Sequence, residues 1–141
     1  RFRRLGRQYQ TQAPGYRFGL RAWRWYPAWV RSLEPGRSPL ADRRPWITYE
    51  ALRPLENMVP RGARVFEFGT GGSTAWFLDR GCRLTSVEHD STWSERVLGT
   101  LGTRDGWDCH CVPPEPLDNA EAGRFRSEFP GYLEASFANY V

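Results

Sequence analysis

The chain has 141 residues, which is enough for one small domain with a real core, and its 40% apolar content is typical of a globular protein. All of its 20 basic residues are arginine, against 16 acids. No run of about 18 apolar residues and no apolar signal core occurs, and three cysteines without framework spacing argue against a disulfide scaffold. We therefore expect no membrane segment and a cytoplasmic location.

The positive charge is concentrated at the start of the chain. Residues 1–31 hold eight arginines and no acid, leaving 12 arginines and all 16 acids to the rest. Aromatic residues interleave with these arginines, a pattern that can bind nucleic acid through phosphates and base stacking. Alternatively, the aromatic side chains dock on the body and the arginines face water. We expect residues 1–44 to form a basic aromatic arm and residues 45–141 to form the domain.

A helix is possible within the arm over residues 20–33, where Pro27 would interrupt or kink it. Its candidate buried positions are Leu20, Trp23, Val30 and Leu33. A second helix follows Pro45-Trp46-Ile47-Thr48, with Thr48 as a candidate N-cap. Apolar residues recur along it at helical spacing, and Pro54 predicts a kink or a restart. Its expected buried side chains are Leu52, Leu55 and Val59.

Strand and helix signals then alternate as β-α-β-α-β. The expected strands are 65–68, 83–88 and 106–112, and the expected helices are 74–80 and about 91–101. Asp90 or Ser91 would cap the second of these helices. Such crossovers give parallel strands, so the chain predicts an α/β, Rossmann-like parallel sheet with flanking helices.

The remainder of the chain predicts no further strand. Pro113-Pro114 closes the last strand, residues 115–127 are polar and irregular, and residues 130–141 predict a helix. Leu133, Phe137 and Tyr140 would lie on one face of that helix. Because the sequence begins without methionine and stops inside this predicted helix, we expect a fragment.

The stretch between the first strand and its helix is the candidate site. Glycines there supply positive φ and open backbone, and the amides of the next helix point at whatever binds. Glu67 precedes the turn, and Glu88 ends the next strand. Carboxyl ends of parallel strands share one crevice, where a carboxylate can accept hydrogen bonds from ribose hydroxyls.

These residues resemble the first two motifs of class I S-adenosylmethionine-dependent methyltransferases, in the pattern Val65-x-Glu67-x-Gly69-x-Gly71-x-Ser73 followed by Val87-Glu88. Over about residues 45–112 the chain resembles a mainly bacterial, uncharacterised group of that fold. The resemblance implies S-adenosylmethionine as cofactor and the first half of the fold, with strand order 3-2-1. The cofactor-binding residues that it implies are Trp46, Glu67, Gly69, Thr70, Gly71, Gly72, Ser73, Glu88 and His89.

In that family the glycines would line the methionyl and ribose parts, Glu67 would lie near the ammonium, and Glu88 would hold the ribose. His89 and Asp90 would flank the adenine, and the Trp46 segment would close over the cofactor. Plainer alternatives remain open from the residues themselves. The glycines can simply make a tight turn, Glu67 can pair with an arginine, Glu88 can be a surface acid, His89 a solvated loop residue and Trp46 a core residue.

The sequence leaves the acceptor and the catalytic residues unknown, because substrate sites in that family come from the fourth strand onward. The first strand would be an open edge, to be covered by the missing half, a second chain or another copy. Cys109 and Cys111 would lie on the opposite strand face from His110, so we expect no metal site.

Two other function classes stay open. One is a nicotinamide-dependent Rossmann oxidoreductase, which is disfavoured because Thr74 replaces the third glycine of its fingerprint. The other is a non-catalytic nucleic-acid-binding or assembly module that uses the arm.

Overall fold

The computed structural model describes residues 23–117, 125–133 and 135–141. The chain divides into two compact units, Arg1–Ser38 and Pro39–Val141. The described part of the first unit holds α3, Tyr26–Arg31, and Pro27 lies in its first turn, where a missing amide hydrogen is harmless. Trp23 is helical and residues 24–25 form a turn before α3 begins, so the predicted interruption lies just ahead of Pro27.

The expected burial in this unit is wrong for three side chains, because Trp23, Val30 and Leu33 are exposed. Leu20 and the first half of the basic arm, residues 1–22, lie outside the described residues.

The second unit begins with a loop and α4, Tyr49–Met58. Thr48 occupies the N-cap position as predicted, but its side chain makes no capping hydrogen bond. The helix runs through Pro54 without restarting, and Leu52 is its buried residue. Leu55 and Val59 are partly buried, so the apolar stripe predicted for this helix faces the interior.

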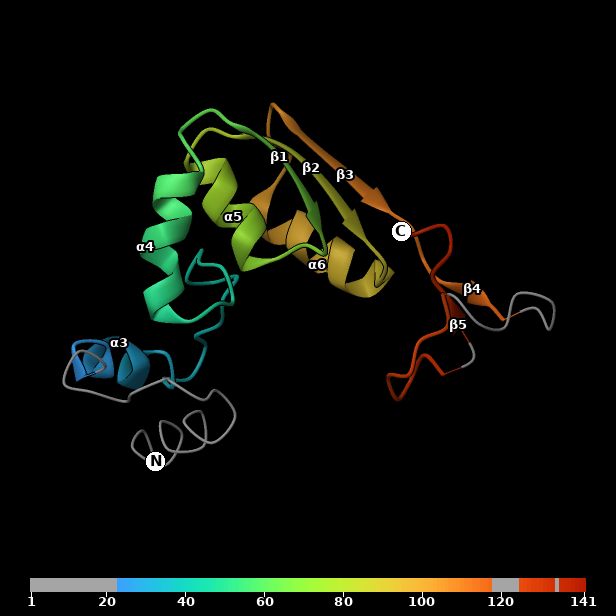
Figure 1. The fold of residues 1–141 in the computed structure, drawn as a ribbon, viewed down its shortest axis with the longest axis horizontal. Helices are drawn as coiled ribbons and strands as arrows, with labels where there is room; N and C mark the ends of the chain where they lie inside the picture. The colour runs from blue at the N-terminus through green and yellow to red at the C-terminus, as the bar shows by residue number, and fades with distance from the viewer. Residues whose placement is uncertain (1–22, 118–124, 134) are drawn as a thin grey trace. The chain divides into compact units, whose positions relative to one another are not determined.

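A three-stranded parallel sheet forms the centre of this unit (Figure 1). Its strands are β1 (Arg64–Phe68), β2 (Arg83–Glu88) and β3 (Trp107–Cys111), in the order β1-β2-β3. The crossover helices are α5 (Gly72–Asp79) and α6 (Ser91–Leu101). The predicted α/β parallel sheet is confirmed, and β1 is an edge of the described sheet, as expected.

Helices cover one face of this sheet. Alternation along β2 turns Leu84, Ser86 and Glu88 inward. Two apolar clusters lie between these strands and the helices, and their buried members are Leu40, Ala75, Phe77, Cys82, Leu84, Val97 and Leu101. On the other face Phe66 and Phe68 are 57% and 56% exposed. Parallel sheets are normally covered on both faces, so this face is unusual for its topology.

The C-terminal part of the unit differs from the prediction. No helix forms over the described residues of 130–141; instead β5 (Ala135–Ser136) pairs antiparallel with β4 (Glu115–Pro116). The expectation of no further strand is therefore also wrong. The apolar spacing of this stretch matched a helix, but Gly131 has a φ of 102°, which a right-handed helix excludes. Pairing with a segment distant in sequence outweighs the weak preference of a short isolated helix.

None of the helices in the described parts of the chain has the length and apolar character needed to cross a membrane.

Candidate functional site

The glycine turn joins the end of β1 to the start of α5. Gly69 and Gly71 have φ values of 81° and 154°, which disfavour any residue with a side chain. The Gly69 amide donates to the Val87 carbonyl oxygen at 2.7 Å, and the Gly71 amide donates to Thr74 Oγ1 at 2.8 Å. The turn is thus fixed both to β2 and to the first turn of its own helix.

Gly72 is required for packing and not for its φ. A Cβ atom at this position would collide with the carbonyl oxygens of Pro39 and Arg44. The same loop is fastened to α5 by Arg43, whose guanidinium donates to the two Asp79 carboxylate oxygens at 2.6 and 2.5 Å. The loop before α4 therefore lies directly on the start of α5.

Glu67 is the centre of a hydroxyl network beneath the turn. Its Oε1 accepts from Thr74 Oγ1 at 2.5 Å and from Ser86 Oγ at 2.8 Å, and its Oε2 accepts from Ser73 Oγ at 2.9 Å. The indole N–H of Trp107 donates to Ser86 Oγ at 3.0 Å, which extends the network to β3. The partners of Glu67 are hydroxyls, so the alternative of an arginine partner is wrong.

Burial raises the pKa of Glu67, although its three hydroxyl donors oppose the shift, and the nearby charge of Glu88 raises it further. The two carboxylates therefore influence each other electrostatically at the ends of neighbouring strands.

Glu88 is 3% exposed, which rules out a plain surface acid. Its Oε2 accepts from the amide and the hydroxyl of Thr70 at 2.8 and 3.0 Å. Its Oε1 accepts from the amides of His89 and Asp90 at 2.8 and 3.0 Å, and lies 3.1 Å from His89 Nδ1. A carboxylate has about four lone-pair positions, so protein donors already occupy them.

His89 packs against three aromatic rings. The His89 ring lies edge-on to Tyr132, Phe137 and Tyr140, with centroid separations of 5.4, 5.4 and 5.5 Å. Its side chain is 31% exposed, so His89 is partly buried and not fully solvated. Trp46, in contrast, is 91% exposed and is not a core residue. Its closure over a cofactor stays a prediction.

The structure brings together the turn, both acids and His89, and it adds residues that the sequence analysis did not select. The Trp93 indole N–H donates to the Thr70 carbonyl oxygen at 2.8 Å, and Asp90 Oδ1 accepts from the Trp93 amide at 2.9 Å as the cap of α6. Spacing alone gave no signal for this role of Trp93, because an apolar residue in the helix predicted over about residues 91–101 indicates only packing. Spacing also gave no signal that aromatic residues would surround His89, because they lie on the segment predicted as a helix.

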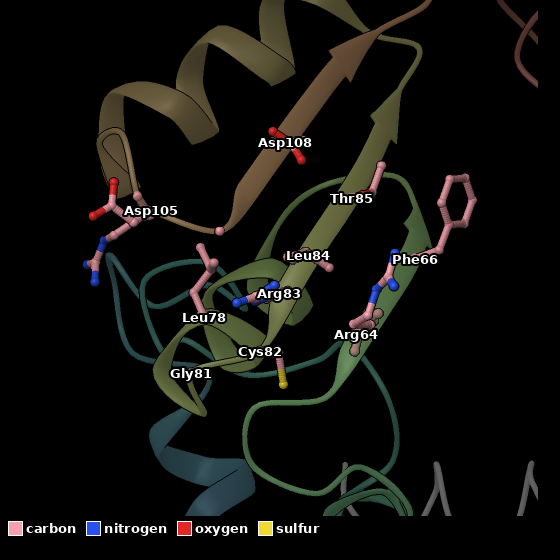
Figure 2. A pocket seen from close by; sticks show the side chains of 13 residues that line it. Arg64, Phe66, Leu78, Gly81, Cys82, Arg83, Leu84, Thr85, Asp105 and Asp108 are labelled. Carbon is pink, nitrogen blue, oxygen red and sulfur yellow. The ribbon is translucent and has the colours of Figure 1, made fainter.

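A cavity of about 1020 Å³ lies elsewhere on the sheet, around the amino-terminal ends of the strands (Figure 2). It is lined by Arg64, Phe66, Arg83, Thr85, Asp105 and Asp108, among others. None of the candidate site residues lines it. In open parallel sheets ligands bind at the carboxyl ends, so we place the candidate site at the glycine turn and not at this cavity.

Within the described residues, no three histidine, cysteine or acidic side chains are grouped as a metal ion would need. Cys109 lies near Ser94 Oγ, with the sulfur 3.9 Å away, whereas His110 is exposed.

The turn brings together amides, hydroxyls, the buried carboxylate of Glu88 and the partly buried carboxylate of Glu67. These groups suit hydrogen bonding to a sugar diol or to an ammonium group. Comparison of the chain with models of protein families, with curated proteins and with solved structures finds no match in any of the three.

Proposed function

We propose that the chain binds S-adenosylmethionine at the glycine turn and forms the cofactor-binding half of an enzyme that methylates an unknown acceptor. The observation that carries this proposal is the buried carboxylate of Glu88, bonded across the crevice to Thr70. An acid at the end of β2, facing a glycine turn at the end of β1, is the arrangement that favours a ribose-bearing ligand in a parallel sheet.

Ribose binding at Glu88 requires an exchange of donors, because its acceptor positions are filled. The two hydroxyls of a ribose can replace the Thr70 hydroxyl and the contact from His89 Nδ1, the side-chain contacts of the carboxylate. The three amide donors can remain, since they belong to the backbone of the turn and of the strand end. Each displaced side-chain contact is replaced by a ribose hydroxyl, so the buried carboxylate is not left without donors.

The proposed role of Glu67 is different. Its carboxylate is committed to three hydroxyl donors, two of which lie in the first turn of α5. Glu67 would therefore keep the turn in shape and offer negative potential to the ligand's ammonium without a direct bond.

Thr74 favours S-adenosylmethionine over a dinucleotide as the ligand of the turn. It stands where a dinucleotide turn has its third glycine, and its fully buried side chain bonds both Gly71 and Glu67. The hydroxyl fills the space that the glycine would leave and holds the turn from inside.

The test is calorimetric titration of the protein with S-adenosylmethionine and, separately, with NADH. We expect only the first to bind, and Glu88→Ala to weaken it by about 1.5–3 kcal/mol through loss of a charge-assisted acceptor. Glu88→Gln keeps the size of the side chain and should weaken binding by less. Glu95→Ala, an exposed acid on α6, is the matched control and should bind normally. The proposal would be contradicted if NADH bound more tightly than S-adenosylmethionine. It would also be contradicted if the Glu88→Ala variant bound S-adenosylmethionine as tightly as the unaltered protein does.

A further inference from the structure

One aromatic ring from the end of the chain lies between the ends of two strands. Tyr140 is 5.4 Å by ring centroid from Phe68, the last residue of β1, and 5.5 Å from His89, which directly follows β2. The crevice between the carboxyl ends of β1 and β2 is the place where a parallel sheet receives its ligand. Tyr140 therefore stands at the entrance to the glycine turn.

The surroundings of the phenol agree with that position. Burial raises the pKa of the Tyr140 hydroxyl, the charge of Glu88 adds to this effect, and the Gly69 backbone opposes it. The hydroxyl is thus close to both Glu88 and the first glycine of the turn.

The segment that carries Tyr140 is held by hydrogen bonds that do not involve its side chain. Asn139 Nδ2 donates to Glu115 Oε1 at 2.8 Å, and the Phe137 amide donates to the Phe125 carbonyl oxygen at 3.0 Å. These bonds flank the small antiparallel sheet of β4 and β5, whereas Tyr140 meets the strand ends through ring packing and through its hydroxyl, which lies near the Gly69 backbone. The ring can leave the crevice without breaking the small sheet.

We propose that Tyr140 gates the crevice, filling part of the ligand's space in the free protein and moving out when a ligand binds. The inference rests on the proposed function, because it takes the ligand to be a nucleoside whose ribose is held by Glu88. The flat base of such a ligand would then replace the tyrosine ring against His89. Binding is weakened by the fraction of molecules in which the gate is closed.

Affinity gives the first test. Tyr140→Ala should tighten S-adenosylmethionine binding by at least about threefold, because the closed state no longer competes. Tyr140→Phe keeps the ring and should bind more nearly as the unaltered protein does. Tyr26→Ala removes an exposed tyrosine of α3 and serves as the control. Unchanged or weaker binding by Tyr140→Ala, with the unaltered protein still binding, would overturn the gate alone. Failure of both proteins to bind would overturn the proposed function, and the gating of this ligand with it.

Proton NMR gives a test that does not depend on affinity. The chain contains two histidines, and the exposed His110 is an internal reference for His89. Ring currents from the three aromatic neighbours should displace the His89 C–H signals from those of His110. In the free protein Tyr140→Ala should move the His89 signals alone, and a ligand should do the same in the unaltered protein. A His89 spectrum that Tyr140→Ala leaves unchanged would overturn the closed state itself.

Discussion

Thr70 donates two hydrogen bonds to one oxygen of Glu88, from its amide at 2.8 Å and from its hydroxyl at 3.0 Å. These bonds join the turn after β1 to the last residue of β2, so the two strand ends are held in one geometry before any ligand arrives. The amide bond can remain when a ribose replaces the Thr70 hydroxyl, so the backbone of the turn keeps its geometry and loses little conformational freedom on binding.

Replacing Thr70 by valine tests the strength of this link. Thr70→Val keeps the shape and the amide bond but removes the hydroxyl donor to the buried Glu88 carboxylate. We expect the free energy of unfolding to fall by about 0.5–1.5 kcal/mol, measured by urea denaturation. Thr92→Val, at an exposed position of α6, is the control, and equal effects of the two substitutions would contradict the link.

Gly72 provides a test of the packing between the first loop and α5. Gly72→Ala places a Cβ atom against the backbone carbonyls of Pro39 and Arg44, and we expect a loss of about 1–3 kcal/mol in the free energy of unfolding. Gly99→Ala, on α6 with open space around it, should instead stabilise by roughly 0.5–1 kcal/mol. If Gly72→Ala is as well tolerated as Gly99→Ala, the close approach is not present in solution.

Glu67 predicts a particular dependence of stability on pH. Its pKa is raised in the folded protein, chiefly by burial, so the folded state binds more protons than the unfolded state above about pH 4.3, the usual glutamate value. The free energy of unfolding should therefore fall as the pH rises from there to the raised pKa. Glu67→Gln should remove that part of the slope in urea titrations repeated across this range. Parallel curves for the two proteins would show that Glu67 does not contribute it.

The face of the sheet that carries Phe66 and Phe68 should bind apolar dyes. Phe66 and Phe68 are both more than half exposed on a parallel sheet, and their rings pack edge-to-face at 5.1 Å. We expect the protein to enhance the fluorescence of anilinonaphthalene sulfonate, and Phe66→Thr to reduce that enhancement because it removes one ring of the pair. Val97→Ala would create a cavity in the core instead, so a similar response from both variants would point to general loosening.

The sequence was sufficient to predict the parallel sheet. β2 runs from Arg83 to Glu88 as expected, because Gly81 ends the preceding helix with a φ of 71° and Asp90 caps the next one. These signals are local, and each lies where the spacing of apolar residues changes between that of a helix and that of a strand. The positions of Glu67 and Glu88 at neighbouring strand ends then follow from the topology alone.

The partners of those acids could not be predicted in the same way. Glu67 could have met an arginine or a hydroxyl, and only the packed fold brings Ser86 and Thr74 to it. The prediction of a helix at the end of the chain was wrong for a related reason. Phe137 and Tyr140 have helical spacing, but their rings are taken up by His89, and the backbone near them pairs with β4. Long-range contacts determine the secondary structure of such segments, and the local spacing of apolar residues carries no information about those contacts.

The most direct measurement is a two-dimensional amide NMR titration of the ¹⁵N-labelled protein with S-adenosylmethionine. Our account predicts that the largest shifts fall on the amides of Gly69, Thr70 and Gly71, and on those of His89 and Asp90 that donate to Glu88. NADH at the same concentration should leave these signals in place. Shifts confined to the cavity lined by Arg64, Arg83 and Asp108, or no shifts at all, would contradict the glycine turn as the cofactor site.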